Sequence, residues 1–338
     1  MADLTVSCAF ATAADSPEHI RIAESLGYER AWLYDTPQQS PDVWVTLALA
    51  AQKTSRIGLG PGVLVPSLRH PMVNATATRT LQLLAPGRLA VAFGTGFTGR
   101  VAMGSPPLPW RYVADYVTAY RGLLRGETVE WEGARMRMMT PDVATARPPD
   151  LPPILLGATG PLGNRYATEL DVDGIMVFGY PPETVRDHSW AAMLTAGTVL
   201  GPGEDHTSPR VLAAAGPGWA INYHFPYAVG GAEVVRQLPG GREFLAVVDR
   251  SEPRDRHFAV HEGHLVTLNA ADRAAWHAGG HALLSNVPTV GTADEIARTA
   301  AELADLGVTE LIYQPAGPDI PTELERFRDA VAGAAEHR

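Results

Sequence analysis

Three segments rich in glycine and proline stand out in this sequence. Residues 58–71 read GLGPGVLVPSLRHP, residues 94–99 read GTGFTG and residues 157–161 read GATGP. Such residues weaken a strand unless the backbone bends or approaches a ligand closely, so the first segment predicts a bulge that packs under a flat ring. The other two segments expose backbone N–H groups, which favour an anion such as a phosphate, above all where a helix begins.

Side chains for acid–base chemistry are fewer. Asp35 follows an apolar run in the sequence YDTP, where its carboxylate would contact a cofactor, orient a substrate or cap the next helix. His70 closes the first glycine-rich segment and is the other candidate for proton transfer. The motif GxSxG is absent, and no spacing singles out a Ser-His-Asp set. Asp35 and His70 are therefore the two catalytic candidates.

Histidines concentrate in the stretch 222–288, which contains the patterns HEGH and HAGGH. Six of the eleven lie there: His224, His257, His261, His264, His277 and His281. Neither pattern is the HExxH of a zinc-binding helix, and Cys8, the only cysteine, offers little help to a mixed site. We therefore predict structural histidines and no metal site. The aromatic residues Trp110 and Trp219 are predicted to line a substrate pocket or to fill the core.

Composition excludes several classes of protein. Lys53 is the only lysine and follows Gln52, so a Walker A loop is excluded. The net charge of −10 argues against a nucleic-acid partner. No apolar run approaches the roughly 20 residues of a membrane span, and no basic segment precedes a long apolar one at the N-terminus, as a signal peptide requires. We expect a cytoplasmic protein that acts on a small molecule.

Apolar runs alternate with helical patterns along the chain, which is typical of repeated strand–helix units. Strands are predicted at residues 4–9, 30–34, 56–65, 88–93, 154–156, 174–178, 211–215 and 311–313, with helices between them, one of which begins near residue 182. A closed (β/α)8 TIM barrel fits these eight strands better than a doubly wound sheet. Residues 222–288 fit the alternation poorly, so we predict an insertion there, near the active-site face, within a single domain over residues 1–338.

Five ordered segments resemble a known family. They read ERAWLYDTP, SRIGLGPGVLVPSLRHP, APGRLAVAFGTGF, PPILLGATGPLGNRYATELDVDGIMV and VGTADEIARTAAELADLGVTELIYQPAG. Together they are similar to the bacterial luciferase-like superfamily, most of all to its branch of methylenetetrahydromethanopterin reductase and F420-dependent relatives. The similarity extends over residues 4–200 and again from residue 287 to the end of the chain.

The resemblance implies an eight-fold barrel, commonly a homodimer, with FMN or the deazaflavin F420 at the carboxyl ends of the strands. It also implies a non-prolyl cis peptide bond in the third strand, which falls on Gly62 and Val63 and supports the ring of the cofactor. The family's phosphate contacts fall on the residues Thr95, Gly96, Gly157, Ala158, Thr159, Gly160 and Pro161.

Three positions depart from the family's patterns. Many F420-dependent members have Asp-His after the second strand, whereas this chain has Asp35-Thr36 and lacks that histidine. Sugar-phosphate dehydrogenases of the group carry a glutamate where this chain has Phe97, which argues against their substrate and places Phe97 in a different substrate pocket. Flavin-binding luciferases carry a phosphate-binding arginine where this chain has Thr95, which favours F420 over FMN, although Arg69 or Arg100 would serve an FMN phosphate.

The sequence thus predicts a flavin- or F420-dependent oxidoreductase that acts by hydride transfer or monooxygenation on a small organic substrate. Two alternatives stay open. A luciferase-like barrel that binds flavin without turnover is compatible with the missing histidine. An NAD-dependent dehydrogenase is suggested by GTGFTG, but its fingerprint should open a helix directly, whereas GSPPLPW follows here and Asp115 falls in a helical pattern.

Overall fold

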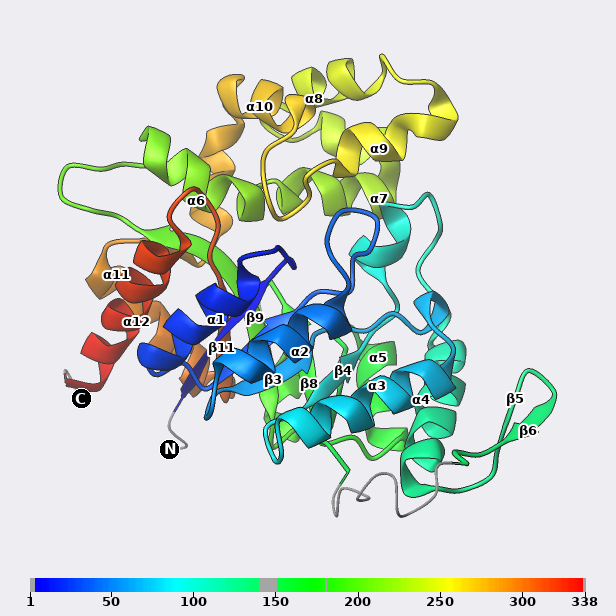
Figure 1. The fold of residues 1–338 in the computed structure, drawn as a ribbon. Helices are drawn as coiled ribbons and strands as arrows, with labels where there is room; N and C mark the ends of the chain where they lie inside the picture. The colour runs from blue at the N-terminus through cyan, green and yellow to red at the C-terminus, as the bar shows by residue number, and fades with distance from the viewer. Residues whose placement is uncertain (1–3, 140–150, 180, 337–338) are drawn as a thin grey trace.

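The computed structural model describes residues 4–139, 151–179 and 181–336 of the chain. Eight parallel strands follow one another in the order β3-β2-β1-β11-β9-β8-β7-β4 (Figure 1). Their bounds are Thr5–Phe10 (β1), Arg30–Leu33 (β2), Gly58–Pro61 (β3), Val91–Phe93 (β4), Ile154–Gly157 (β7), Gly174–Phe178 (β8), Ala191–Val199 (β9) and Glu310–Gln314 (β11). A short strand, β10 (Thr289–Gly291), pairs with β9.

The two ends of this strand order meet, which closes the sheet into a barrel. Parallel bridges join Leu59 to Leu89 and Leu64 to Phe93, across the gap between β3 and β4. The backbone N–H of Gly94 also donates to the carbonyl oxygen of Leu64 at 3.0 Å. The predicted (β/α)8 barrel is therefore confirmed.

Helices cover the outside of the barrel (Figure 1). They are α1 (Ser16–Ser25), α2 (Val43–Lys53), α3 (Pro71–Leu84), α4 (Trp110–Arg125), α5 (Pro161–Glu169), α11 (Ala293–Asp305) and α12 (Ile320–Glu336). Local sequence fixes several starts: Asp42 accepts N–H bonds from the first turn of α2, and Thr292 and Glu295 form a reciprocal capping box at α11. No helix in the described part of the chain is long and apolar enough to cross a membrane.

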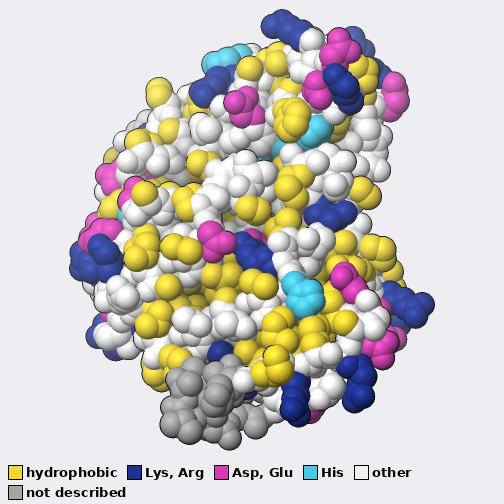
Figure 2. Space-filling model, turned by 45° about the vertical axis from the view of Figure 1, so that its right-hand side comes forward, with side chains coloured by type: hydrophobic (Ala, Val, Ile, Leu, Met, Phe, Trp, Pro, Cys, Tyr) yellow, Lys and Arg dark blue, Asp and Glu magenta, His cyan; other side chains and the backbone are white. Residues whose placement is uncertain are grey.

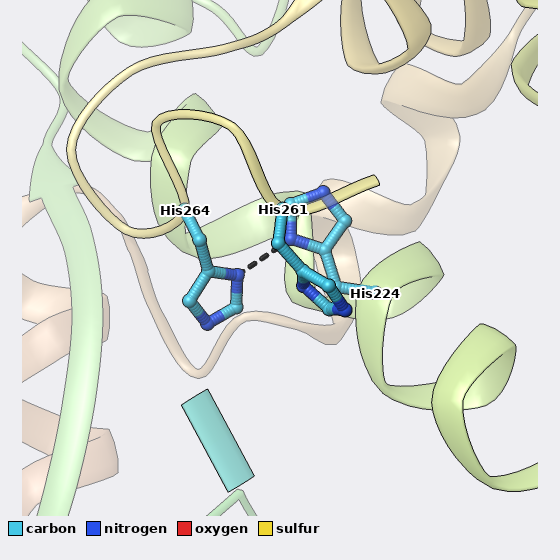
Figure 3. Close-up of side chains that lie close together, drawn as sticks. All are labelled: His224, His261 and His264. Carbon is cyan, nitrogen blue, oxygen red and sulfur yellow. Dashed lines mark hydrogen bonds between the residues drawn. The ribbon is translucent and has the colours of Figure 1, made fainter. Parts of the chain in front are cut away.

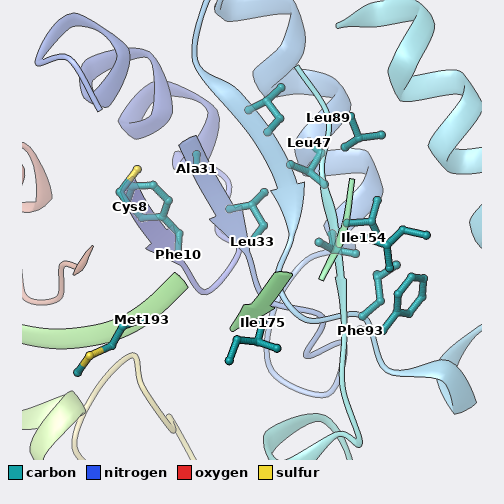
Figure 4. Close-up of a cluster of buried hydrophobic side chains, with 14 of the residues drawn as sticks. Cys8, Phe10, Ala31, Leu33, Leu47, Leu89, Phe93, Ile154, Ile175 and Met193 are labelled. Atoms are coloured by element: carbon teal, nitrogen blue, oxygen red, sulfur yellow. The ribbon is translucent and has the colours of Figure 1, made fainter. Parts of the chain in front are cut away.

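The main core fills the space between the strands and these helices, and Figure 4 shows part of it around Leu33, Phe93 and Ile175. A second group of buried side chains fills the inside of the barrel. There the large ring of Trp32 lies among small residues such as Ala90 and Ala192. Close packing around so large a ring requires small neighbours, so the alanines belong to the packing of Trp32.

A separate helical region lies over one end of the barrel, at the top of Figure 1. It consists of α6 (Pro209–Trp219), α7 (Ile221–Arg236), α8 (Gly241–Val248), α9 (Arg256–His261) and α10 (Ala270–His277), followed by a 3₁₀ turn at Gly280–Asn286. Its own core contains Trp219, Tyr223 and Phe244, all fully buried. We call residues 209–288, which include the segment 222–288 predicted from the sequence, the insertion.

Two predicted elements are wrong: a predicted strand is a helix, and the missing barrel strand lies in a segment predicted as a helix. Residues 211–215 were expected to form a barrel strand, but they lie in α6. The strand that completes the barrel is β9, in a stretch expected to be helical. β9 reads AAMLTAGTV, and its alanines favour a helix in isolation, whereas Pro217 and its flanking glycines count against one in α6. Pairing with β8 and β11 on its two sides overrides that propensity.

A small two-stranded sheet lies next to the barrel. The segment after α4 forms an antiparallel hairpin of β5 (Val129–Trp131) and β6 (Ala134–Met136). Trp131 is buried and lies edge-on to Tyr112 and Tyr116 of α4, which fixes the hairpin to the barrel's outer layer.

Candidate active site

A cavity of about 670 Å³ opens at the carboxyl ends of the barrel strands, beneath the insertion. Its wall is mostly apolar. The barrel contributes the exits of β2, β3, β4, β7 and β8, and the insertion contributes residues from α6, α7 and the loop before α10. This is the face on which barrel enzymes carry their chemistry, because the loops after the strands converge there.

The exit of β3 forms a ridge in the cavity wall. The peptide bond between Gly62 and Val63 is cis, as the resemblance predicted, and both residues line the cavity. A Cβ atom on Gly62 would lie 2.8 Å from the ring of Trp32, and one on Gly94 would lie 2.7 Å from Cγ2 of Val63. Glycine at both positions therefore lets the ridge lie close against the neighbouring strands.

The exit of β4 holds the GTGFTG motif, and Thr95, Gly96 and Phe97 all line the cavity. Gly96 has a φ of 84°, and a Cβ there would lie 2.6 Å from Val65, so the turn requires glycine. The motif leads into a π-helical turn over Phe97–Val101, and the next α-helix starts only at Trp110. In a closed barrel, the Rossmann interpretation of this motif is wrong.

The exit of β7 is split between the cavity and the protein surface. Gly157 and Thr159 line the cavity, whereas Ala158 is fully buried. Gly160 is the N-cap of α5 and Pro161 its first residue, and neither belongs to the cavity wall. The helix start predicted as a phosphate site thus lies beside the cavity, with only two of its five residues in the lining.

Asp35 lines the cavity but is bonded within the protein. Nη1 of Arg69 lies 2.7 and 2.8 Å from its two carboxylate oxygens, and the N–H of Val65 donates to it at 3.4 Å. Nη2 of Arg69 bonds to Asp42 at 2.7 Å. Burial raises the pKa of the Asp35 carboxyl, and the charge of Arg69 opposes that rise. Asp35 therefore fixes the β2 exit rather than presenting a free base.

Three other predicted site residues lie outside the cavity lining. His70 is exposed and serves as N-cap of α3, where its Nδ1 accepts the N–H of Met72 at 3.1 Å. Trp110 stacks on Tyr166. Trp219 is fully buried in the core of the insertion, where its indole N–H donates to the carbonyl oxygen of Gly280 at 2.9 Å. His70 thus caps a helix, and Trp219 belongs to the core of the insertion.

The insertion supplies a histidine that the sequence did not single out for this cavity. His264 lines the cavity, and its Nε2 lies 3.2 Å from Oγ1 of Thr98, another lining residue. Its Nδ1 lies 2.6 Å from Nδ1 of His224, whose Nε2 lies 2.9 Å from Oδ1 of the buried Asp272. Figure 3 shows His224 of α7 close to His261, the last residue of α9, and to His264 on the loop that follows α9.

Burial favours the uncharged form of His261 and His264. It lowers the pKa of His261 to about 3 and holds the pKa of His264 well below its usual range, and the neighbouring imidazoles act in the same direction. Nδ1 of His261 is buried and has no hydrogen-bond partner among the described residues. The HEGH pattern was the available signal for this cluster, but its contact with Thr98 joins residues far apart in sequence.

The family to which the chain belongs follows from comparison with known proteins. The family described as luciferase-like monooxygenase matches residues 5–198, more than half of the chain, so this chain belongs to that family. The 5,10-methylenetetrahydromethanopterin reductase of Methanolobus tindarius is 27% identical over 333 residues, which cover 93% of this chain and 94% of the relative.

Other relatives match a shorter part of the chain. The 5,10-methylenetetrahydromethanopterin reductase of Methanopyrus kandleri is 32% identical over 182 residues, 48% of this chain and 51% of that protein. The F420-dependent glucose-6-phosphate dehydrogenase of Intrasporangium calvum is 34% identical over 166 residues, 44% of this chain and 49% of that protein. The chain thus matches only about half the length of these two relatives.

Solved structures share the fold at low sequence identity. The coenzyme F420-dependent tetrahydromethanopterin reductase from Methanopyrus kandleri superposes with a TM-score of 0.69 at 19% identity, over 98% of this chain and 99% of the other. A monooxygenase from Streptomyces bottropensis gives a TM-score of 0.61 at 18% identity, over 98% of this chain and all of the other. These likenesses cover the insertion as well as the barrel.

Proposed function

We propose that this chain is an oxidoreductase that uses F420, or alternatively FMN, and acts on a small organic substrate. The observation that carries the proposal is the apolar cavity at the strand exits, with the Gly62–Val63 ridge in its wall. Bound there, either cofactor would supply the transfer of hydride or the activation of oxygen. The protein's share is to hold the ring, shield it from water and position a substrate.

The walls fit a flat ring with a phosphorylated tail. Val63 and Met176 offer an apolar surface, and Gly94 and Gly157, which lack side chains, let Val63 lie close against the exits of β4 and β7. The hydroxyls of Thr95, Thr98 and Thr159 are the polar side chains at the β4 and β7 exits. The cavity wall thus has hydroxyl groups at the exits of β4 and β7 and apolar side chains beside the ridge.

One arginine close to this wall keeps an unneutralised charge. Arg100 donates to the carbonyl oxygen of Pro106 at 2.6 Å and to Oγ of Ser67 at 2.7 Å, and no described carboxylate pairs with it. Arg69, in contrast, is bonded to two aspartates. Arg100 is therefore the cation that we propose for the phosphate of either cofactor.

The relatives favour F420 as the first candidate. The dehydrogenase of Intrasporangium calvum and the reductase structure from Methanopyrus kandleri are both named as F420-dependent. The structural likeness to a monooxygenase keeps FMN as the alternative. Phe97 stands in the cavity where the sugar-phosphate dehydrogenases carry a glutamate, so we propose a substrate other than a sugar phosphate.

A titration of the purified protein tests the proposal. Quenching of cofactor fluorescence would be followed with F420, FMN and riboflavin, which lacks the phosphate of FMN. We expect micromolar binding of F420, weaker binding of FMN and the weakest binding of riboflavin. Arg100→Gln should reduce the difference between FMN and riboflavin, whereas Arg111→Gln, on an exposed side chain of α4, should not. Absence of binding by all three ligands would overturn the proposal.

Binding without turnover is a second candidate, and one observation favours it. The titratable side chains in the cavity wall are bonded to other protein groups: Asp35 to Arg69, His264 to His224, and the hydroxyl of Tyr34 to Oε1 of Gln314 at 2.6 Å. Reoxidation of the bound, reduced cofactor by a panel of small carbonyl and imine compounds separates the two. Tight binding with no reoxidation faster than in free solution would support the second candidate.

The expected cytoplasmic location and the homodimer stay predictions. Exposed apolar side chains support self-association: Val45 and Leu49 of α2 are 60% and 50% exposed, and Val73 of α3 is 53% exposed. Figure 2 shows hydrophobic side chains gathered across the lower half of one face. Light scattering after gel filtration should give a dimer for the native chain and a monomer for the Val45→Glu, Leu49→Glu double variant.

A further inference from the structure

Three buried histidines of the insertion bring their ring nitrogens together. His224 comes from α7, and His261 and His264 come from the end of α9 and the loop after it. One ring nitrogen of each lies within 4.8 Å of those of the other two, and the exposed fractions are 0%, 3% and 1%. Burial of this kind is uncommon for histidine unless each ring nitrogen has a partner.

The hydrogen bonds around the cluster divide into outer and inner ones. On the outside, Nε2 of His224 faces the carboxylate of Asp272 at 2.9 Å, and Nε2 of His264 faces the hydroxyl of Thr98 at 3.2 Å. On the inside, only the two Nδ1 atoms of His224 and His264 bond to each other, at 2.6 Å. Nδ1 of His261 has no described partner. Because Asp272 and Thr98 bond to the Nε2 atoms, the Nδ1 atoms of the histidines are left to face one another.

This is the arrangement of a metal site with its outer shell. A histidine that binds a metal usually donates its other ring N–H to a carboxylate or another oxygen, which fixes the ring and its tautomer. Asp272 and Thr98 stand in those places for His224 and His264. The unpartnered nitrogen of His261 is then the third ligand that the protein itself leaves unsatisfied.

The spacing requires a small adjustment. Zn–N bonds of about 2.0–2.1 Å in a tetrahedral site place ligand nitrogens about 3.4 Å apart. The observed range runs from 2.6 Å to no more than 4.8 Å, on both sides of that value. One proton now joins Nδ1 of His224 to Nδ1 of His264. Moving it to Nε2 of His264, where it would donate to Thr98, frees both lone pairs without any change in net charge.

We propose that His224, His261 and His264 bind a divalent transition-metal ion, Zn²⁺ by ligand preference, with Asp272 as the positioning residue of His224. Neutral imidazoles are the ligand form, and a three-histidine set leaves a fourth position for water. The ion ties α7 to the loop after α9 and, through Thr98, to the exit of β4. Because His264 also lines the cavity, the ion lies one side chain away from it.

Metal analysis of the native chain tests this without any variant. The protein is expressed in zinc-supplemented medium, freed of any affinity tag, dialysed and analysed by mass spectrometry for metals. We expect about one zinc per chain, in line with a preformed three-histidine site. After removal of the zinc by chelation, titration with Co²⁺ should produce the visible absorption bands of tetrahedral cobalt. A chain free of metal that also gives no cobalt bands would overturn the proposal.

Variants locate the ion. His264→Gln and His261→Gln should each weaken Co²⁺ binding at least 100-fold, while His277→Gln, an exposed histidine at the end of α10, should leave it unchanged. Asp272→Asn keeps all three ligands and should weaken binding about 10–100-fold, with the cobalt bands retained but shifted. Equal binding by the His264→Gln and His277→Gln variants would place the metal elsewhere and contradict the assignment.

This inference and the proposed function fail separately. Metal content is measured without F420 or FMN, and cofactor titration is repeated on the chelated protein. A chain that contains zinc but binds neither cofactor would support the metal site and contradict the proposed function. A chain that binds a cofactor but no metal would support the proposed function and contradict the metal site.

Discussion

Two buried polar clusters border the cavity, and they differ in chemistry. The barrel cluster is the carboxylate of Asp35 held by Arg69, which also holds Asp42. Its charges are opposite and paired. The insertion cluster is made of imidazoles around His224 and His264, with a ring nitrogen of His261 that has no described partner. The first cluster holds a strand exit in place, and the second has capacity to bind something more.

The same contrast holds for the two cores. The barrel core is continuous from strand to helix around the molecule, whereas the core of the insertion is a separate set of side chains around Trp219 and Phe244. A unit with its own core has its own stability. We therefore expect the insertion to unfold locally without rearrangement of the barrel strands.

The largest expected effect tests that separation. Trp219→Ala removes a fully buried ring and its hydrogen bond to Gly280, and it should lower the free energy of unfolding of the insertion by about 3–5 kcal/mol. In hydrogen exchange, amides of α7 to α10 should lose protection while those of β7 and β8 keep it.

The matched control is a buried ring of the barrel. Phe327→Ala removes a fully buried side chain of α12 that stacks on Tyr313 at 3.9 Å between ring centroids. Protection should then fall in the barrel strands as well as in the insertion. If Trp219→Ala exposed strands and insertion equally, the two cores would be one cooperative unit and the comparison would fail.

The second effect compares two carboxylates that share one arginine. Asp35→Asn leaves Arg69 without its buried partner, and such a loss should lower the free energy of unfolding by about 3 kcal/mol. Asp42→Asn removes the other carboxylate, whose side chain is 44% exposed against 1% for Asp35, and should cost no more than about 1 kcal/mol. Urea denaturation of both variants measures the difference. Equal losses would mean that burial does not make the Asp35–Arg69 pair more important for stability than the Asp42–Arg69 pair.

Much of the barrel could be predicted because its signals are local. Glycines after β3, β4 and β7 mark backbone that bends at a strand exit, and the structure places Gly62, Gly96 and Gly157 in the cavity wall. Local signals could not show that residues 191–199 form the strand β9 and that residues 211–215 lie in the helix α6. Alanine and proline preferences pointed the wrong way there, and the pairing of β9 with two neighbouring strands is a long-range interaction that outweighs them.

The insertion side of the site depends on long-range contacts almost entirely. His224 and His264 are 40 positions apart, and His264 and Thr98 are 166 apart, so no spacing rule joins them. Trp219 and His70, which were predicted for the site, lie outside the cavity lining. Both residue types are suited to ligand contact, but Trp219 packs in the core of the insertion and His70 caps α3.

The third effect tests whether the ridge carries cofactor binding. Gly94→Ala would place a Cβ 2.7 Å from Cγ2 of Val63 and so displace the ridge. We expect F420 affinity to fall about tenfold, equivalent to about 1.4 kcal/mol, with little change in metal content. Gly333→Ala, on α12 with no atom within 4 Å of the new Cβ, is the control and should bind F420 normally. An unchanged affinity in Gly94→Ala would remove the ridge from the site.

The smallest effect concerns the ion pairs of Arg210, at the start of the insertion in α6. Arg210 bonds to Glu204, to Oε1 of Glu323 at 2.5 Å and to Oγ1 of Thr198 at 2.8 Å. We call these contacts the joint between barrel and insertion. The hydrogen bond to Arg210 is the largest of the effects that lower the pKa of Glu204 to about 2. A glutamate in the unfolded chain has a pKa of about 4.3. The carboxylate therefore stabilises the fold above that value and loses its effect as the pH falls towards 2.

Glu204→Gln should accordingly lower the free energy of unfolding by about 1 kcal/mol at neutral pH, because the side chain is partly exposed to solvent. The difference from the native chain should shrink as urea denaturation is repeated from about pH 7 down to about pH 3.5. Glu233→Gln, in an exposed pair with Arg236 on α7, should show no such trend. If both variants had the same pH dependence, the joint would contribute no more than an ordinary surface ion pair, and the insertion would be held to the barrel by its apolar contacts and the histidine cluster instead.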